Sequence, residues 1–435
     1  MNEKWSNLNV YYNSLFVGHL TKTKHQNSDE YAFTYTQEYV ESDQTVPLGV
    51  NLPKSFEAYS CKDKLPPFFD NLVSEGWLRE NQSKALNKQD FKGDKFDILS
   101  YFGFDLIGSV SIKQDQNYNK LCPPHFDYIR SLSDSQDSNL SQASCVSIDS
   151  NSTISGVQKK VLVKKIYSEF CLTTVDQLST HIAKLESERF PHLIELEYLS
   201  TRVMKILLPN DQIHNVQIDF IHELMENALI VERFDRYYSN GIVKRKHFEE
   251  FNQLLDMHSE DKYNFSYDEM GHFMRNSRLC KHEDLLKLFK RILACILIGN
   301  TDAHLKNFAM FHNHDGSLSL TPMYDIVASS FYPQLNTLAL TLNGKKDAII
   351  NDLKPKQIVE FALNPKGFGL NAELLIEIID EFNIYKQQAY FFLENENTNE
   401  KVQKKLAEMI HRRWNGSFEG VKSYLDKRKN RKTSK

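Results

Sequence analysis

Gly299-Asn-Thr-Asp-Ala-His-Leu-Lys-Asn307 is the stretch that decides the fold of this 435-residue chain. Its Asp302 and Asn307 are five positions apart, in the pattern D-x-x-x-x-N. An apolar segment, 285–298, precedes it. That segment is apolar nearly all round near its end, which predicts a helix buried in a core. The polar stretch is therefore expected to be a loop that leaves a buried helix.

Two short alternating runs and a second aspartate follow this loop. The runs 308–311 and 317–320 are joined by Asn313-His-Asp-Gly316, which predicts a hairpin, and Asp325 comes next. Protein kinases place their catalytic loop and metal-binding aspartate in this order, with the same Asp-to-Asn spacing. In that chemistry one Asp accepts a hydroxyl proton, while an Asn and a second Asp hold Mg²⁺ through oxygen ligands. Because aspartate and asparagine are common turn residues, an ordinary polar loop stays open on this pattern alone.

The composition indicates a protein of two or three domains with a sizeable core. The chain is 41% hydrophobic and 25% charged, and it is too long for one simple core. Its net charge of −4 gives no reason to expect nucleic acid as the main ligand. The six cysteines form no C-x-x-C pair, which argues against a zinc ribbon or a disulfide framework. Without an apolar leader or a run of 18 apolar residues, we expect a cytoplasmic protein with no membrane contact.

The first part of the chain reads as α+β. Residues 10–20 predict a hairpin that turns at Asn13-Ser14. Residues 66–79 predict a short helix that closes near Gly76. Nine of the residues 131–152 are serine, which is typical of a flexible loop or linker.

A turn and a strand lysine suggest phosphate binding after this serine-rich stretch. The turn 152–160 holds one glycine, and such a turn before a strand can wrap phosphates with its N–H groups. It does not have the P-loop spacing, and an ordinary turn remains open. Lys184 lies inside a strand pattern, where a lysine faces either solvent or phosphates. Glu195 or Glu197, on the next predicted helix, could pair with it or lie exposed.

Residues 228–236 run from apolar to charged within a few positions. This pattern is typical of a small lobe's last strand followed by a hinge that meets an adenine edge.

Taken together, these pieces resemble the HipA family of bacterial serine/threonine kinases, the toxin half of HipBA-type toxin–antitoxin pairs. The resemblance covers residues from about 10 to 345, in the family's order. The matching pieces are Phe68-Phe-Asp-Asn-Leu72, Ile154-Ser-Gly-Val-Gln-Lys-Lys160, Thr180-His-Ile-Ala-Lys184, Val231-Glu-Arg-Phe-Asp-Arg236, Gly299 to Asn307 and Pro322-Met-Tyr-Asp-Ile326.

The resemblance implies ATP and Mg²⁺ as cofactors and a role for each matching residue. Asp302 matches the catalytic Asp, and Asn307 and Asp325 match the metal ligands. The residues matched to ATP contacts are Ile154, Ser155, Gly156, Val157, Gln158, Lys159, Lys160, Lys184, Glu232, Arg233, Phe234, His304 and Asn307.

The resemblance also implies regulation and partners. Family members autophosphorylate a serine just before the phosphate loop, which ejects the loop. That position is Thr153 here, with Ser155 two residues on, so either is the expected site. The implied protein substrate is an aminoacyl-tRNA synthetase, whose phosphorylation inhibits translation and promotes persistence. The implied partner is a small helix-turn-helix antitoxin, through which alone the chain would meet DNA.

The expected fold is therefore α+β, a two-lobed kinase-like fold with an added N-terminal subdomain and a helical C-terminal lobe. The expected parts are an N-terminal subdomain (1–115), a serine-rich linker (116–153), a small lobe with the phosphate loop and hinge (154–236), a helical large lobe (237–426) and a basic tail (427–435).

Two alternatives to an active kinase make different demands on the sequence. A pseudokinase or binding module would have lost Asp302, Asn307 or Asp325, and none is lost. A metallohydrolase using Asp302, His304 and Asp325 would need a second histidine cluster. Only two histidines follow nearby, at the predicted hairpin tip: His312 and His314.

Overall fold

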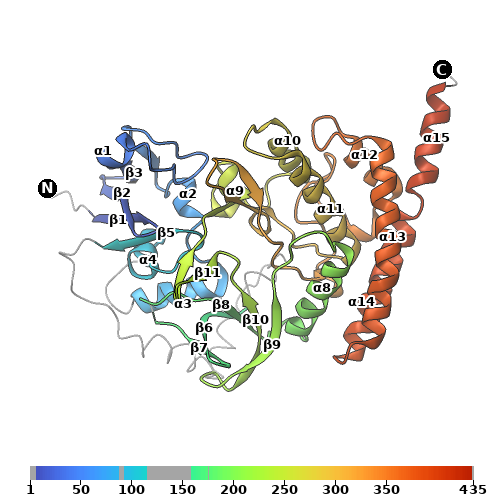
Figure 1. The fold of residues 1–435 in the computed structure, drawn as a ribbon, viewed down its shortest axis with the longest axis horizontal. Helices are drawn as coiled ribbons and strands as arrows, with labels where there is room; N and C mark the ends of the chain where they lie inside the picture. Colours follow the sequence, from blue (N-terminus) through green and yellow to red (C-terminus); the bar gives the residue numbers. More distant parts are fainter. Residues whose placement is uncertain (1–5, 88–92, 115–157, 175, 434–435) are drawn as a thin grey trace. The chain divides into compact units, whose positions relative to one another are not determined.

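The computed structural model describes residues 6–87, 93–114, 158–174 and 176–433, which fall into two units (Figure 1). The first, here called the β-rich unit, comprises Met1–Leu185 and Asp219–Ser259. The second, the helical unit, comprises Glu186–Ile218 and Glu260–Lys435. The α+β class predicted from the sequence is confirmed.

A five-stranded antiparallel sheet opens the β-rich unit, with the strand order β4-β3-β2-β1-β5. Its strands are β1 (Ser6–Tyr12), β2 (Leu15–Lys24), β3 (Asp29–Tyr35), β4 (Tyr59–Lys62) and β5 (Val110–Gln114). The predicted first hairpin is confirmed, because Tyr12 pairs with Leu15 across Asn13 and Ser14. Both turn residues have positive φ, 47° and 73°, as a tight two-residue hairpin requires.

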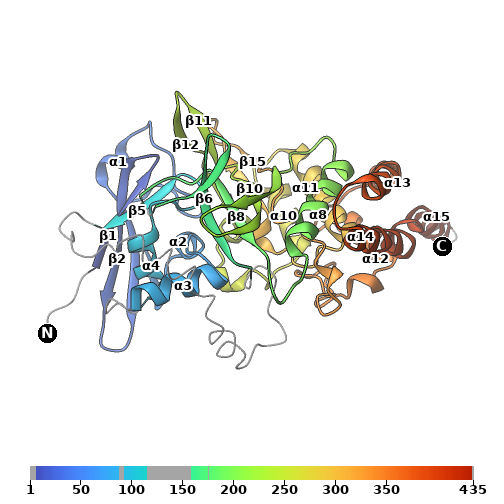
Figure 2. The same cartoon turned by 90° about the horizontal axis from the view of Figure 1, so that it is seen from below.

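Four helices accompany this sheet: α1 (Gln37–Glu41), α2 (Pro67–Asp70), α3 (Gly76–Asn87) and α4 (Lys95–Phe102). In Figure 2, α2, α3 and α4 gather beside the β1–β5 sheet. The single helix predicted over 66–79 is wrong. The side-chain amide of Asn71 donates to Pro67 O at 2.8 Å and to Met257 O at 2.7 Å. These hydrogen bonds lie where α2 ends. Gly76, with φ of 52°, then begins α3 rather than closing a helix.

A second five-stranded sheet has the order β7-β6-β8-β10-β9. Its strands are β6 (Lys160–Ile166), β7 (Glu169–Leu172), β8 (His181–Leu185), β9 (Val216–Ile221) and β10 (Glu226–Glu232). Branched and aromatic side chains such as Val163, Phe170 and Ile230 form its core. The hairpin β11 (Arg236–Ser239) and β12 (Ile242–Arg245), strand β13 (Phe248–Glu250) and helix α9 (Phe251–Leu254) complete the unit.

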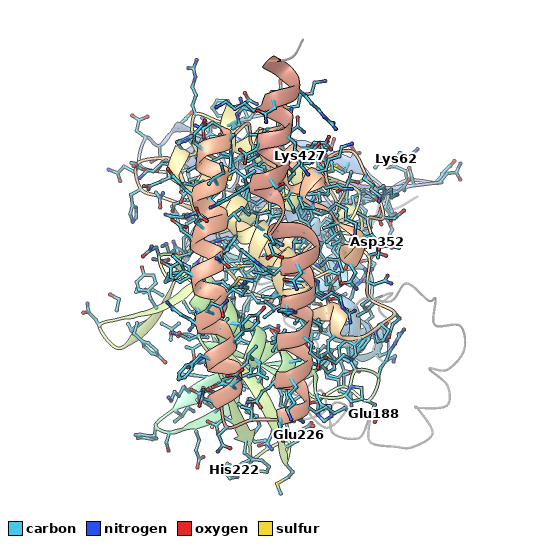
Figure 3. The ribbon with its side chains drawn as sticks, turned by 90° about the vertical axis from the view of Figure 1, so that its right-hand side faces the viewer. Lys62, Glu188, His222, Glu226, Asp352 and Lys427 are labelled. Carbon is cyan, nitrogen blue, oxygen red and sulfur yellow. The ribbon has the colours of Figure 1, made fainter. Side chains whose placement is uncertain are left out.

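The helical unit is built around α11, whose last eight residues are all buried. Its elements are α8 (Leu193–Leu207), α10 (Tyr267–Asn276), α11 (His282–Ile298), β14 (Ala309–His312), β15 (Leu318–Leu320), α12 (Pro355–Leu363), α13 (Ala372–Asn395), α14 (Glu400–Arg413) and α15 (Val421–Thr433). Figure 3 shows α13 and α14 side by side, with Lys427 on α15. The first residues of the predicted basic tail are thus helical. No helix in the described ranges is long and apolar enough to cross a membrane.

Candidate active site

The loop 299–307 begins where α11 ends. Gly299 caps the helix with φ of 91°, a left-handed conformation that glycine adopts without steric cost. The N–H groups of Gly299 and Asn300 both donate to Cys295 O at 2.9 Å. The chain therefore turns sharply out of a buried helix, as the sequence predicted.

Asp302 follows this turn and is held from two sides. Its N–H donates to Asn300 Oδ1 at 3.1 Å, and its carbonyl accepts from His304 N–H at 2.8 Å. The hydroxyl of Tyr263 donates to Asp302 Oδ1 at 2.9 Å. The carboxylate is partly exposed, so it has both a fixed orientation and access to solvent.

Asn307 and Asp325 come together, although 18 positions separate them in the chain. Asn307 Nδ2 lies 3.4 Å from Asp325 Oδ2, and Asn307 Oδ1 accepts from His304 N–H at 3.0 Å. The one-turn helix Leu305–Asn307 carries the amide. The β14–β15 hairpin, paired from Met310↔Leu320 onward, returns the chain to the loop. The hydroxyl of Tyr324 then donates to Lys306 O at 2.7 Å.

This donor set fits Mg²⁺. The Asp325 carboxylate is a hard oxygen ligand, and Asn307 Oδ1, which accepts from one N–H, keeps a second lone pair for a cation. Mg²⁺ is commonly held by one or two protein groups together with substrate phosphates. Asp325 adopts φ of 54°, a left-handed conformation that Asp adopts more readily than most residues with a Cβ. The described residues contain no group of three or more His, Cys, Asp or Glu that could form an all-protein cage. They therefore offer no histidine cluster for the alternative metallohydrolase.

Two serines after Asp325 fasten the start of the loop. Thr301 N–H donates to Ser329 Oγ at 2.8 Å, and Thr301 Oγ1 lies 2.8 Å from the same oxygen. Ser330 donates to Gly299 O twice, from its N–H at 3.0 Å and from its Oγ at 2.9 Å. The segments that carry Asp302 and Asp325 are therefore tied to each other by hydrogen bonds, of which those of Ser329 are buried.

In the β-rich unit, Lys184 lies in β8 directly opposite Lys160 of β6. Directly opposed strand residues point to the same face of a sheet, and like charges there repel each other. Lys184 is only 4% exposed, so it is not the solvated strand lysine that the sequence left open. Lys184 is thus a buried lysine that pairs with Lys160 across the β6–β8 ladder.

The predicted hinge ends in a buried ionic network. The guanidinium of Arg233 lies 2.9 Å from Asp235 and 3.3 Å from Asp105, and Arg236 contacts both carboxylates at 2.7 and 2.8 Å. Burial opposes ionisation of Asp235, but the two arginines outweigh it and lower its pKa to about 2. The backbone N–H of Arg233 donates to Thr180 O at 3.0 Å. The side chain and N–H of Arg233 thus serve the protein's own interior.

The remaining predicted residues are located as follows. Glu232 ends β10, and Phe234 packs on Phe248 with ring centroids 5.0 Å apart. The buried imidazole of His304 stands edge-on to Tyr263 at 5.0 Å. Gln158 is buried, Lys159 precedes β6, and Lys160 is the first residue of β6. The other predicted residues lie outside the described ranges: Thr153, Ile154, Ser155, Gly156 and Val157.

The helix glutamates left open by the sequence differ in environment. Glu195 contacts His192 at 3.1 Å near the start of α8. Glu197 is completely buried. Glu197 is therefore not an exposed helix residue.

Sequence reasoning missed Tyr263, Ser329, Ser330 and Asp105. Each acts through a partner that is 28 or more positions away in the chain. No local spacing marks such residues.

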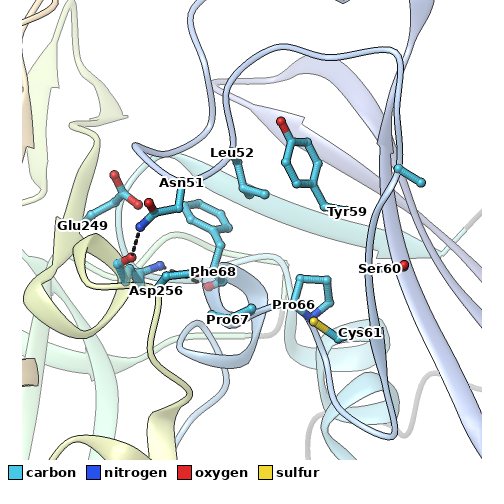
Figure 4. Close-up of a pocket in the computed structure, with 12 residues that line it drawn as sticks. Asn51, Leu52, Tyr59, Ser60, Cys61, Pro66, Pro67, Phe68, Glu249 and Asp256 are labelled. Carbon is cyan, nitrogen blue, oxygen red and sulfur yellow. Dashed lines mark hydrogen bonds between the residues drawn. The ribbon is translucent and has the colours of Figure 1, made fainter.

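A separate cavity of about 330 Å³ lies in the β-rich unit (Figure 4). Leu52, Tyr59 and Phe68 line it together with Glu249. Asn51 closes one side, where its amide donates to Gln253 O at 2.9 Å. None of the described site residues named above lines this cavity, so it carries no part of the predicted chemistry.

Two family models match the chain. The HipA-like C-terminal domain matches residues 152–389, and the HipA N-terminal domain matches residues 8–113. The first match alone covers more than half of the chain and includes the loop, Asn307 and Asp325.

Individual proteins are similar over most of their length. The serine/threonine-protein kinase toxin HipA of Shewanella oneidensis is 26% identical over 390 residues, 85% of this chain and 85% of that protein. A Sinorhizobium fredii protein named "Putative kinase Y4mE" is 28% identical over 362 residues, 78% of this chain and 81% of that protein. The solved complex of Shewanella oneidensis HipA, HipB and operator DNA contains a chain that matches with a TM-score of 0.74 and 21% identity. That match covers 96% of this chain and 99% of the other, and at this identity it speaks for the fold.

Proposed function

The chain belongs to the HipA family, with both of the family's domains, and from that premise we propose that it is a serine/threonine protein kinase. In this proposal the kinase uses Mg·ATP and is the toxin of a toxin–antitoxin pair. The observation that carries the proposal is the arrangement of Asp302, Asn307 and Asp325 around the loop that leaves α11. The similarity to a named kinase toxin over 85% of the chain supports it.

In this proposal Asp302 is the group that accepts the proton of the substrate hydroxyl. The Tyr263 hydroxyl bonds one carboxylate oxygen and so fixes the direction in which the carboxylate faces. The hydrogen bonds at Asn300 and His304 fix the backbone of the same residue. Such preorganisation matters because proton transfer needs heavy atoms within hydrogen-bond reach.

Asp325 and Asn307 would hold Mg²⁺, which when bound would neutralise charge on the phosphates of ATP. We also propose that Lys184 and Lys160, which lie opposite each other on β8 and β6, contact phosphate oxygens of ATP. The left-handed backbone of Asp325 orients its carboxylate toward Asn307. We assign the adenine contact to the backbone on either side of Arg233, at Glu232 and Phe234, because the Arg233 guanidinium is bound to Asp105 and Asp235 and its N–H donates to Thr180 O.

The finer parts of the function are proposals from the family resemblance. We propose an aminoacyl-tRNA synthetase as the protein substrate, with growth arrest as the consequence. We propose a small helix-turn-helix antitoxin as the partner, in keeping with the similarity to a HipA that was solved with HipB and operator DNA. Self-inactivation by phosphorylation at Thr153 or Ser155 belongs to the same proposal.

Replacement of Asp302 by Asn tests the kinase assignment. The substitution removes the proton acceptor, keeps a group of the same size and leaves the Mg²⁺ ligands in place. We expect transfer of labelled phosphate from Mg·ATP to fall about 10²–10⁴-fold, the usual worth of a general base. The melting temperature should stay near that of the wild type. Full activity in the variant would refute the assignment of Asp302.

A further inference from the structure

Arg413, the last residue of α14, is buried without a carboxylate partner in the described part of the chain. It is 2% exposed. Its Nη2 donates to Ser330 Oγ, but its Nε and Nη1 have no hydrogen-bond partner among the described residues. Burial, with a smaller repulsion from Arg412, lowers the pKa of Arg413 to about 10, so the group stays charged at neutral pH. A buried cation with unused donors lowers stability, so its presence needs a reason other than stability.

The one hydrogen bond of Arg413 leads to the start of the loop 299–307. Ser330 Oγ accepts from Arg413 and donates to Gly299 O at 2.9 Å. The Ser330 hydroxyl has a single hydrogen. Because its oxygen accepts the N–H of Arg413, the hydrogen points away from Arg413 and is donated to the Gly299 carbonyl. Arg413 therefore sets the direction of the Ser330 hydroxyl, and the hydroxyl fixes the peptide that follows α11.

The guanidinium also packs directly against Gly299. A Cβ at this glycine would overlap Ser330 Oγ and would lie 2.6 Å from Arg413 Cζ. The guanidinium of Arg413 thus lies where the side chain of residue 299 would be. Three residues further along the chain stands Asp302. A shift of Arg413 would move the turn from which the loop departs.

The end of α14 is itself anchored, which gives Arg413 a fixed base. After Arg413 the chain continues as a π-helical turn, Trp414–Phe418, a rare conformation that is frequent at functional sites. Lys386 of α13 lies 4.0 Å over the Trp414 ring. Ser417 Oγ donates to Leu353 O at 2.7 Å.

We propose that Arg413 is a positioning residue for Asp302, which acts through Ser330 and Gly299 on the loop rather than on the nucleotide. The inference rests on the proposed kinase function. It extends the catalytic machinery to α14, which lies beyond the matched C-terminal domain at 152–389. Because a misplacement of about 1 Å can cost on the order of 10²-fold in rate, loss of this brace should be visible in kcat.

The test compares Arg413→Met with Arg412→Met, a matched control at the exposed neighbouring residue of the same helix. Methionine keeps an unbranched apolar stem but removes the guanidinium, and with it the buried charge and the donors. For Arg413→Met we expect kcat for phosphate transfer to fall about 10-fold or more, with KM for ATP changed less than about 2-fold. Its melting temperature should be unchanged or higher, because replacing an unpaired buried charge with an apolar group often stabilises a protein. Arg412→Met should match the wild type.

Hydrogen–deuterium exchange provides a readout that does not depend on activity. Peptides that cover 299–304 should exchange faster in Arg413→Met, while peptides from the β14–β15 hairpin should not change. Ser330→Ala should reproduce both effects, and the double variant should be no worse than Ser330→Ala alone. If Arg413→Met does not fold, the Ser330→Ala variant decides.

Two results would overturn the inference. One is unchanged exchange at 299–304 in Arg413→Met, and the other is an equal loss of kcat in Arg412→Met. A wild-type chain that transfers no phosphate would instead refute the proposed function. In that case the exchange experiment still decides whether Arg413 orders the loop.

Discussion

Replacing Gly299 by alanine should damage the fold and the chemistry together, because this residue combines a left-handed backbone with a crowded face. Its φ is 91°, and an added Cβ would meet Ser330 and the Arg413 guanidinium. Holding an alanine in the left-handed region costs roughly 1–2 kcal/mol. Forcing a methyl group into a packed site costs about 1–3 kcal/mol more. We therefore expect Gly299→Ala to lower the free energy of unfolding by roughly 2–5 kcal/mol.

Gly316 provides the matched control. It lies at the β14–β15 turn with φ of 79°, and a Cβ there would meet nothing within 4 Å. Gly316→Ala should therefore show only the backbone cost, roughly 1–2 kcal/mol. Denaturant unfolding measures both variants, and labelled-phosphate transfer is followed under conditions in which each remains folded. Equal destabilisation of the two variants, or normal phosphate transfer by Gly299→Ala, would refute the reasoning.

Three further predictions follow from other parts of the molecule. Asp325→Ala should abolish the Mg²⁺ dependence of ATP binding with little effect on stability. Calorimetric titration of ATP with and without Mg²⁺ measures this. Binding equal to that of the wild type would mean that Asp325 has only a structural role. Asp235 has a pKa of about 2 in the folded state, below its unfolded value of about 3.9. The stability that its ionisation contributes is therefore present above pH 4 and is lost as the pH falls from about 4 to 2. Asp235→Asn should have a lower free energy of unfolding than the wild type at pH 7, and this free energy should fall less as the pH is lowered. Urea unfolding at a series of pH values measures both proteins. The same fall in both would contradict the prediction. Incubation with Mg·ATP should phosphorylate Thr153 or Ser155 and stop ATP binding, because the added charge of about −1.5 to −2 repels the phosphates of ATP. Mass spectrometry of the wild type and of a variant with alanine at both positions tests for the modification. A phosphorylated chain that still binds ATP would disprove self-inactivation.

Features that depend on neighbouring residues could be predicted from the sequence. The turn at Asn13-Ser14, the buried helix before Gly299 and the hairpin before Asp325 each follow from a local pattern of apolar and turn residues. The spacing of Asp302 and Asn307 also predicts a polar loop here. In the structure this loop ends in the one-turn helix Leu305–Asn307.

Features that depend on distant partners could not be predicted. The helix expected over 66–79 fails because Asn71 is bonded to Met257, a residue from another part of the chain. The apolar run before Glu232 predicts the strand β10, but the burial of the Arg233 side chain depends on Asp105, which is 128 positions away. Arg413 ends an amphipathic helix, and nothing in its neighbourhood distinguishes it from the exposed Arg412.

The network of Arg233, Arg236, Asp105 and Asp235 has a consequence for dividing the polypeptide. Asp105 comes from the N-terminal part of the β-rich unit, and the other three residues come from the connection between β10 and β11 and from the first residue of β11. A cut within 115–157 would leave the two arginines on one fragment and half of their counter-charge on the other. Each fragment alone would expose or bury unpaired charge, so the pieces should be insoluble or unstable when made separately. Made together they should recombine into a stable pair, and fragment complementation would then report on the integrity of this ionic network.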